Sequence, residues 1–350
     1  MNGPATNRVL TCAEALYEGT VQEMERDPSV FVFGIGVDDF KGFYGTTRNL
    51  HQRFGRDRCF DTPLSEDAMT GFAIGAALAG YRPIHCHIRM DFLLLGMNQL
   101  VNIAAKARYM YGGQVSVPLV IRSVIGRSWG QGAQHSQGLH ALFMHIPGLK
   151  VVAPSTPYDS KGCLVAAIRD PDPVVMIEHR MVHSQRGHVP EELYTVPFGR
   201  CRVLRPGTDV TIVAVSYMAV EAMRAAALLE EAGVSAEVVD PVSLMPLDIE
   251  GIAASVRKTG RLLVVDTDWT ACGAAAEIVA AVLERLGPSG VQFRRMGYAP
   301  VPCPTTKNLE NLYYPNPRTI AESAHQLVHG RPRTFVAPEA AEILEFKGPF

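Results

Sequence analysis

Cysteine patterns that build metal sites or disulfide frameworks are missing from this sequence of 350 residues. The seven cysteines are an odd number scattered along the chain, and none forms a CxxC pair with the ligand spacing of a zinc site. Structural zinc and a disulfide framework are therefore excluded as the basis of the fold. Unpaired cysteines of this kind are typical of a reducing compartment, and we expect a cytoplasmic protein.

An excess of charge of one sign is missing as well. The formal net charge is −2 and only 19% of the residues are charged, which excludes a nucleic-acid footprint and a polybasic membrane surface. The first residues lack a basic region followed by an apolar core, so we expect no signal peptide. Glycine, proline or charge interrupts every apolar stretch before membrane-spanning length, so we expect no transmembrane helix.

The common nucleotide and nucleophile motifs are also missing. The sequence has neither a GxxxxGK[ST] loop nor a GxSxG elbow. Gly34-Ile35-Gly36 follows an apolar run, but the third glycine of a dinucleotide loop is lacking, so a plain strand-end turn is favoured. A nicotinamide-dependent dehydrogenase that acts alone is accordingly a distant alternative.

What the sequence does contain is an alternation of short aliphatic runs and helical patterns. The runs predict strands at 30–35, 117–123, 151–154, 174–178, 210–216, 236–240 and 262–266. The patterns between them predict helices at 12–26, 67–78, 97–111, 157–169, 218–231, 248–258 and 273–286. Continuous apolar strands separated by helices indicate an α/β protein with doubly wound parallel sheets, and the length favours two domains.

A polar, proline-bearing stretch without periodicity at 183–199 suits an interdomain linker. We therefore predict a first domain at 1–190, a second at 191–330 and a C-terminal tail at 331–350.

Three segments carry candidate chemistry. Thr62-Pro-Leu-Ser-Glu66 places a carboxylate at the start of a helix with Gly71, Gly75 and Gly80, whose small residues predict close packing on all sides. Glu66 is either a buried functional acid or a favourable first-turn residue after a Ser65 N-cap. His135 lies in a glycine-rich loop after a predicted strand, where α/β proteins place ligand chemistry. Asp170-Pro-Asp-Pro173 is a turn or a weak cation site.

Several further motifs stand in the same order as in a known family. The chain resembles the β subunit of the two-chain 2-oxoacid dehydrogenases, the thiamine-diphosphate decarboxylase component of the transketolase-like superfamily. The likeness runs from about residue 10 to about residue 327, and its motifs are Thr62–Glu66, Arg89-Met-Asp-Phe92, Asn98–Lys106, Gly112-Gly113, Ala133–Gln137 and Pro147–Pro154.

The resemblance implies a pyrimidine-binding domain followed by a transketolase C-terminal domain. It assigns to Glu66 a hydrogen bond with N1′ of the aminopyrimidine, which helps the cofactor to lose its thiazolium proton. Phe92 matches the residue that stacks on the pyrimidine, and Leu64 and Ile88 line its slot. His135 matches the histidine that faces the substrate carboxylate.

The resemblance also implies a potassium site on the carbonyls of Leu119, Ala167, Ile168 and Asp170, with Asp172 replacing a more usual Asn. The Gly-Asp-Gly…Asn-Asn motif that holds the cofactor's diphosphate and Mg²⁺ in this superfamily does not occur in the sequence. A separate α chain is therefore expected to complete the site, most simply in an α₂β₂ tetramer, and a lipoyl acyltransferase core is a further candidate partner.

Two departures from the family pattern bear on function. Gly34-Ile35-Gly36-Val37 lacks the usual acid, so proton relay between two active sites through position 35 is not expected. The segment His87-Ile-Arg-Met-Asp91 is more polar than the usual segment ahead of Phe92. Its Arg89, together with Arg127, can bind an anionic or hydroxylated substrate, although structural roles for the two arginines are equally open.

These features predict a pyruvate dehydrogenase-like enzyme that decarboxylates a 2-oxo acid and passes the acyl unit to lipoamide. The alternatives are a two-component transketolase or carboligase with an aldehyde, ketone or sugar acceptor, and a non-catalytic scaffold for the α chain. The sequence does not select the 2-oxo acid or the acceptor.

Overall fold

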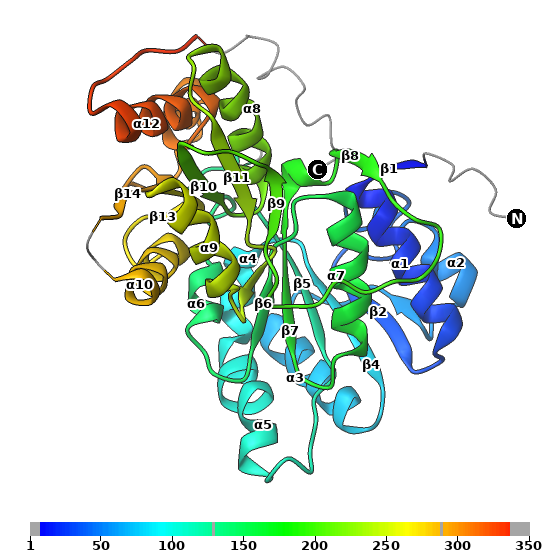
Figure 1. Ribbon diagram of the computed structural model, residues 1–350. Helices are drawn as coiled ribbons and strands as arrows, with labels where there is room; N and C mark the ends of the chain where they lie inside the picture. Colours follow the sequence, from blue (N-terminus) through cyan, green and yellow to red (C-terminus); the bar gives the residue numbers. More distant parts are fainter. Residues whose placement is uncertain (1–7, 128–129, 288–289, 337–350) are drawn as a thin grey trace, which may run out of the picture.

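The computed structural model describes residues 8–127, 130–287 and 290–336, and in these residues the strands form two large sheets and one short ribbon (Figure 1). The first sheet consists of β12 (Ser243–Met245), β6 (Lys150–Val152), β7 (Val174–His179), β5 (Val120–Ile125), β4 (Arg82–His87), β2 (Val30–Gly34) and β3 (Cys59–Phe60), in that order. The second consists of β14 (Gln292–Tyr298), β13 (Arg261–Trp269), β10 (Val210–Ala214), β11 (Ala236–Asp240) and β9 (Arg202–Arg205). Only the edge strands β12 and β9 pair antiparallel in these sheets.

Helices cover both faces of the sheets. They are α1 (Cys12–Arg26), α2 (Leu50–Phe54), α3 (Glu66–Leu78), α4 (Met90–Leu93), α5 (Ala105–Met110), α6 (His140–Met144), α7 (Pro157–Arg169), α8 (Tyr217–Glu231), α9 (Ile249–Thr259), α10 (Ala274–Leu286), α11 (Lys307–Tyr313) and α12 (Pro317–His329). Shorter turns are η1 (Phe43–Gly45), η2 (Leu94–Gly96) and η4 (Arg180–Val182), and η3 (Gln99–Ala104) is π-helical. No helix of the described ranges is both long and apolar enough to cross a bilayer.

The strands of the first sheet are buried on both faces. Along β2, Phe31 and Phe33 enter one hydrophobic cluster while Val30 and Val32 enter another, because successive side chains point to opposite faces. The first of these clusters continues into the second sheet through residues such as Val264. The predicted doubly wound α/β fold is therefore confirmed, and one hydrophobic cluster spans the two halves of the chain.

Helix boundaries agree with the sequence prediction where strong caps occur. The helices α1 and α7 have the predicted bounds, since Thr11 forms a capping box with Glu14 and Thr156 caps a helix that begins with Pro157. Ser65 stands at the N-cap position of α3, but its side chain makes no capping hydrogen bond. Ser65 thus occupies the predicted N-cap position with Glu66 in the first turn, but its hydroxyl does not cap the helix.

The stretch predicted as a linker is bound to the first half of the chain. Within it, β8 (Arg186–His188) pairs antiparallel with β1 (Val9–Thr11). The ammonium group of Lys161 on α7 donates to the carbonyls of Pro190, Glu191 and Glu192 at 3.0 to 3.2 Å. These contacts end the first half of the chain with an ordered strap rather than a free connection.

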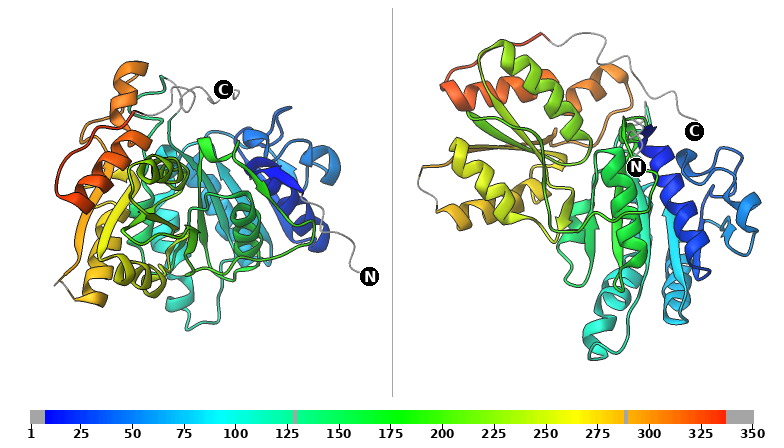
Figure 2. Two further views of the ribbon diagram at one scale, coloured as in Figure 1. Left: turned by 45° about the horizontal axis from the view of Figure 1, so that its top comes forward. Right: turned by 45° about the vertical axis from the view of Figure 1, so that its right-hand side comes forward.

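The second half returns to the first sheet through β12. After β11 the chain crosses to β6, where Ser243 lies opposite Val152 and Met245 opposite Val151. The loops at the carboxyl end of the first sheet also touch the second half: a Cβ added at Gly138 would lie 1.7 Å from the carbonyl oxygen of Thr267. Figure 2 shows the C-terminal half, in green to red, lying beside the first half of the chain.

A buried carboxyl group stands at the crossing between the halves. Asp240, the last residue of β11, accepts hydrogen bonds from the Val242 amide at 2.8 Å and from the Ser155 hydroxyl. Burial and the nearby Asp159 carboxylate raise the pKa of Asp240 to about 7. The Ser155 hydrogen bond and the Arg202 charge act in the opposite direction but are outweighed. Since an ordinary aspartate has a pKa of about 4, the native state binds the extra proton between about pH 4 and pH 7. The free energy of unfolding therefore falls as pH rises through this window.

The variant Asp240→Asn tests this linkage. The carboxamide can accept from Val242 and donate to Ser155, so the hydrogen bonds persist while the ionisation is removed. We measure the free energy of unfolding of variant minus wild type by urea unfolding at each pH. We expect this difference to be more favourable to the variant at pH 8 than at pH 5 by about 1 to 3 kcal/mol. Asp57→Asn, at an exposed position, is the control. If Asp240→Asn differs from wild type by the same free energy of unfolding at both pH values, the raised pKa of Asp240 is contradicted.

Candidate functional site

The candidate residues gather beyond the carboxyl ends of adjacent parallel strands. The strands β7, β5, β4 and β2 are neighbours in the first sheet and run parallel. Ligands of open α/β sheets bind outside this edge. Ile88 and Arg89 follow β4, and Arg127 and His135 lie in the loop that follows β5.

Glu66 is the first residue of α3, where the exposed backbone amides of a helix start favour a negative charge. Its side chain is half-buried. The segment that carries Phe92 packs against this turn: a Cβ added at Gly96 would lie 2.7 Å from the Thr70 hydroxyl and 3.4 Å from the Glu66 carbonyl oxygen. The glycine thus lets the backbone that follows Phe92 approach the first turn of α3.

The glycines of α3 do not pack as the sequence predicts. A Cβ added at Gly71 would meet only Gln99 at 3.8 Å, and none of the described atoms lies within 4 Å of one added at Gly75 or Gly80. The expectation of close packing on all sides is therefore wrong within this chain. The small residues leave part of the helix surface open instead.

Phe92 and His135 come from separate segments and meet. Their ring centroids are 5.1 Å apart at an interplanar angle of 71°, an edge-to-face contact. The Phe92 side chain remains 37% exposed and that of Leu64 80% exposed, while Ile88 is half-buried. Phe92 and Leu64 therefore leave apolar surface exposed.

Asp91 fixes this pair, a role that the sequence analysis missed. Its Oδ1 accepts from the Gln137 side-chain amide at 2.7 Å and from the Gln137 backbone amide at 3.3 Å. The bonds tie α4 to the loop of His135, two residues before Gln137. Burial raises the pKa of Asp91. In the sequence, only the position of Asp91 next to Phe92 could have indicated this role.

The two arginines proposed for substrate binding lie in different surroundings. The Arg89 guanidinium donates to the Gln131 side-chain oxygen and to the Tyr44 hydroxyl. The Arg127 guanidinium lies 5.5 Å from the centroid of the Tyr314 ring, in the C-terminal half of the chain. A third arginine, Arg180, which was not predicted, follows β7 and donates to the same partners as Arg89.

The oxygens proposed for potassium are in contact with cationic side chains. Arg82 donates to the carbonyls of Ile168 at 2.7 Å and Asp170 at 3.3 Å, and Lys150 donates to both oxygens of the Asp170 carboxylate. The Leu119 carbonyl accepts the Val174 amide at 2.9 Å and that of Ala167 the Asp170 amide at 3.2 Å.

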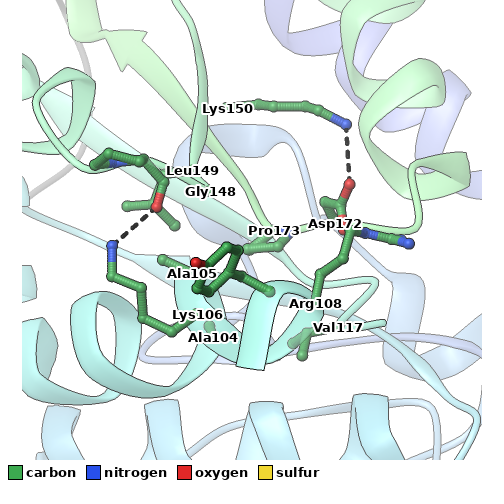
Figure 3. A pocket seen from close by; sticks show the side chains of 12 residues that line it. Ala104, Ala105, Lys106, Arg108, Val117, Gly148, Leu149, Lys150, Asp172 and Pro173 are labelled. Atoms are coloured by element: carbon green, nitrogen blue, oxygen red, sulfur yellow. Dashed lines mark hydrogen bonds and ion pairs between the residues drawn. The ribbon is translucent and has the colours of Figure 1, made fainter. Parts of the chain in front are cut away.

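Lys150 also lies 3.5 Å from the Asp172 carboxylate, as Figure 3 shows, and Arg108 donates to Asp172. These residues border a mainly apolar cavity of about 720 Å³ beside α5. The carbonyl oxygens fit a hard cation in type, but a potassium ion here would share two of them with Arg82.

Comparisons with known proteins cover almost the whole chain. Residues 8–184 match the transketolase pyrimidine binding domain, and residues 199–320 match the transketolase C-terminal domain. The acetoin:2,6-dichlorophenolindophenol oxidoreductase subunit beta of Cupriavidus necator is 44% identical over 336 residues, which cover 92% of this chain and 98% of the relative. The pyruvate dehydrogenase E1 component subunit beta of Porphyra purpurea is 41% identical over 317 residues, covering 90% and 96%.

A solved structure has the same fold. A split-gene transketolase, described as an inactive beta4 tetramer, superposes with a TM-score of 0.73 at 24% identity, covering 93% of this chain and 99% of that chain.

Proposed function

Because this chain belongs to the transketolase-like family of β subunits of the thiamine-diphosphate-dependent 2-oxoacid dehydrogenases, we propose that it supplies the pyrimidine half of such an active site. The enzyme decarboxylates a 2-oxo acid, with pyruvate as the proposed donor, and passes the acyl unit to an acceptor such as lipoamide. The observation that carries the proposal is the contact of Phe92 with His135, and the half-buried Glu66 at the start of α3 supports it.

The residues present fit one half of the cofactor. Thiamine diphosphate, when bound, supplies the nucleophile for the 2-oxo carbon and holds the electrons released on decarboxylation. We assign to Glu66 the proton shared with a ring nitrogen, and to Phe92, Leu64 and Ile88 an apolar slot for an aromatic ring. The position of Glu66 at the helix start and the exposed apolar surface of Phe92 and Leu64 support these assignments. To His135, which is in edge contact with Phe92, we assign the contact with the substrate carboxylate.

A separate α chain is proposed to close the slot and to hold the diphosphate and Mg²⁺. The supporting feature is an apolar face that we infer from the large side chains exposed on and next to α3, η2, η3 and α5, because α3 packs on η2 and η3 and η3 packs on α5. The large apolar side chains exposed on it are Leu64, Phe72, Leu78, Tyr81, Leu94, Leu95, Ile103, Tyr109, Met110 and Tyr111. A face of this size is costly to leave in water, and the open glycines of α3 lie in the same region. An α₂β₂ tetramer in the cytoplasm, with or without a lipoyl acyltransferase core, is the proposed assembly.

Two further assignments are proposals of the same kind. Arg89 and Arg127 contact the substrate. A potassium ion at Leu119, Ala167, Ile168, Asp170 and Asp172 steadies the turn after α7, where Arg82, Lys150 and Arg108 already hold the same group of oxygens.

Since these cations already satisfy part of the oxygen set, we expect exchange of KCl for choline chloride at equal ionic strength to lower the melting temperature by only a few degrees. A melting temperature that does not change at all would contradict a potassium site, and NaCl is the control for a non-specific salt effect.

Turnover assays of the assembled enzyme test the function. With the α chain, thiamine diphosphate and Mg²⁺ present, the proposal expects pyruvate-dependent reduction of lipoamide. Ketol formation with an aldehyde acceptor in place of lipoamide reduction would favour the two-component transketolase or carboligase. Absence of both reactions, with assembly intact, would favour a scaffold.

A further inference from the structure

The segment that carries His135 packs against the C-terminal half of the chain on both of its flanks. Before His135, a Cβ added at Gly132 would lie 2.8 Å from a side-chain carbon of Thr305. After it, a Cβ added at Gly138 would lie 1.7 Å from the Thr267 carbonyl oxygen. Because contacts this close leave no room for a side chain, the two glycines let the segment lie directly on the second half of the chain.

A buried histidine ends this segment and forms a polar contact between the two halves. Nε2 of His140, the first residue of α6, lies 2.9 Å from Oδ1 of Asp266 on β13. Neither side chain has exposed surface. The second oxygen, Oδ2, accepts the backbone amide of Ala275 in the first turn of α10 at 2.9 Å. Because a carboxylate only accepts hydrogen bonds, Nε2 of His140 is the donor in this contact.

The contact between His140 and Asp266 is favoured in its charged form. Although burial acts against it, the charge and the hydrogen bond of Asp266 raise the pKa of His140, and the Asp268 carboxylate acts in the same direction as Asp266. A hydrogen bond between charged partners is stronger than one between neutral partners. The end of the segment is therefore joined firmly to β13.

The same segment is also bonded to the first half of the chain. The Gln137 side-chain amide donates to Asp91 at 2.7 Å, and the neighbour of Asp91 is Phe92, whose ring contacts that of His135. Gln137 and His140 are only three residues apart. The position of the His135 ring relative to Phe92 thus depends on one hydrogen bond within the first half and one to the second half.

From this geometry we propose that His140 and Asp266 are positioning residues. Their buried hydrogen bond fixes the segment 133–140 on the second half of the chain and so holds the His135 ring against Phe92. A displacement of about 1 Å in a catalytic group can lower a rate roughly a hundredfold, so a contact five residues away is close enough to control turnover. The effect on turnover rests on the function proposed above, whereas the effect on the segment does not.

Hydrogen–deuterium exchange of the purified full chain measures the segment directly. In His140→Leu, which removes the donor, the amides of residues 133–139 are expected to exchange at least about tenfold faster than in wild type, because the segment opens more easily. His145→Leu, at the exposed C-cap of the same helix, is the control and is expected to exchange like wild type. Unchanged exchange in His140→Leu overturns the proposal.

A double variant separates positioning from stability. His140→Leu leaves the Asp266 carboxylate buried without its side-chain donor, so the melting temperature is expected to fall. Adding Asp266→Leu removes the second charge and is expected to recover part of that melting temperature, while the exchange of the segment stays fast because leucines make no directional bond. Slow exchange in the double variant indicates a merely structural pair and overturns the proposal. The double variant carries the test if His140→Leu does not fold.

The assembled enzyme then tests the connection to His135. With the α chain, thiamine diphosphate and Mg²⁺ present, His140→Leu is expected to lower kcat/KM by roughly 10- to 100-fold. His140→Gln, which keeps a donor, is expected to lower it by less than about threefold, and the control His145→Leu by less than about twofold. In a His135→Ala background, His140→Leu is expected to cost less than about twofold further, because the ring that it positions is gone.

An equal loss in the wild-type and His135→Ala backgrounds overturns the proposal, because it indicates a role that does not act through His135. No loss in the wild-type background overturns it as well. If the wild-type assembled enzyme is inactive, the proposed function fails and the exchange measurement alone decides the role of His140 and Asp266.

Discussion

The variant Glu66→Gln is expected to lower kcat of the assembled enzyme by roughly a hundred- to ten-thousandfold. Glutamine fits the same position at the start of α3 but cannot hold or release the proton that a ring nitrogen shares with a carboxyl group. The loss is expected in kcat rather than in assembly. Steady-state turnover, with size-exclusion chromatography of the complex, measures both.

A neighbouring acid provides the matched control. Asp67 is the next residue of the same helix turn, is exposed, and accepts a hydrogen bond from Gln99 at 3.0 Å. Asp67→Asn removes a charge of the same sign from the same helix start, so its kcat is expected to stay within about twofold of wild type. Full activity of Glu66→Gln would remove the catalytic assignment.

The second large effect is expected on stability, from Arg122→Leu. Arg122 on β5 is fully buried and donates to both oxygens of Glu178 at 2.6 and 2.8 Å and to the Thr46 hydroxyl at 2.9 Å. Although burial acts to raise it, the charges and hydrogen bonds of Arg122 and His183 hold the pKa of Glu178 at about 2. Without Arg122 the Glu178 carboxylate is buried with only His183 beside it, and we expect the free energy of unfolding to fall by about 3 to 5 kcal/mol at pH 7.

The pH dependence and a double variant test this cause. In Arg122→Leu the pKa of Glu178 is expected to rise, so lowering the pH protonates the carboxyl group and returns part of the lost stability. Removing both charges with Arg122→Leu and Glu178→Leu is expected to cost less than the single change. Urea unfolding at pH 5 and pH 7 measures these effects, and a single-variant loss below about 1 kcal/mol would show that the ion pair is not essential.

The elements that the sequence predicts well are those with local signals. Continuous apolar runs identify the buried strands β7, β10 and β11 to within a few residues, because both faces of these strands are covered. The central strand β4 was missed because it reads Arg-Pro-Ile-His-Cys-His, although His85 and His87 are buried side by side with ring nitrogens 3.2 Å apart. The edge strand β14 was missed because it is polar and partly exposed.

The candidate site divides in the same way. Glu66, Phe92 and His135 stand in motifs that can be recognised from the sequence, and they remain assignments until the variants are measured. Tyr44, Gln131 and Arg180 occur in no such motif. They come from three separate loops, and only the parallel order of β2, β4, β5 and β7 brings them to Arg89. A single sequence contains no record of that proximity.

The crossing of β12 limits how this chain can be divided. The polar composition of the strap at 183–199 suggests it as a place to divide the chain into two fragments. An N-terminal fragment that ends there would lack β12, so the edge of β6 would be unpaired and exposed to other strands. Because the crossing lies more than forty residues beyond the strap, no single cut there yields two self-sufficient pieces. The N-terminal fragment is expected to aggregate when it is expressed alone, and to recover when the C-terminal fragment is supplied as a separate chain. The two halves of the chain are therefore expected to fold only in each other's presence.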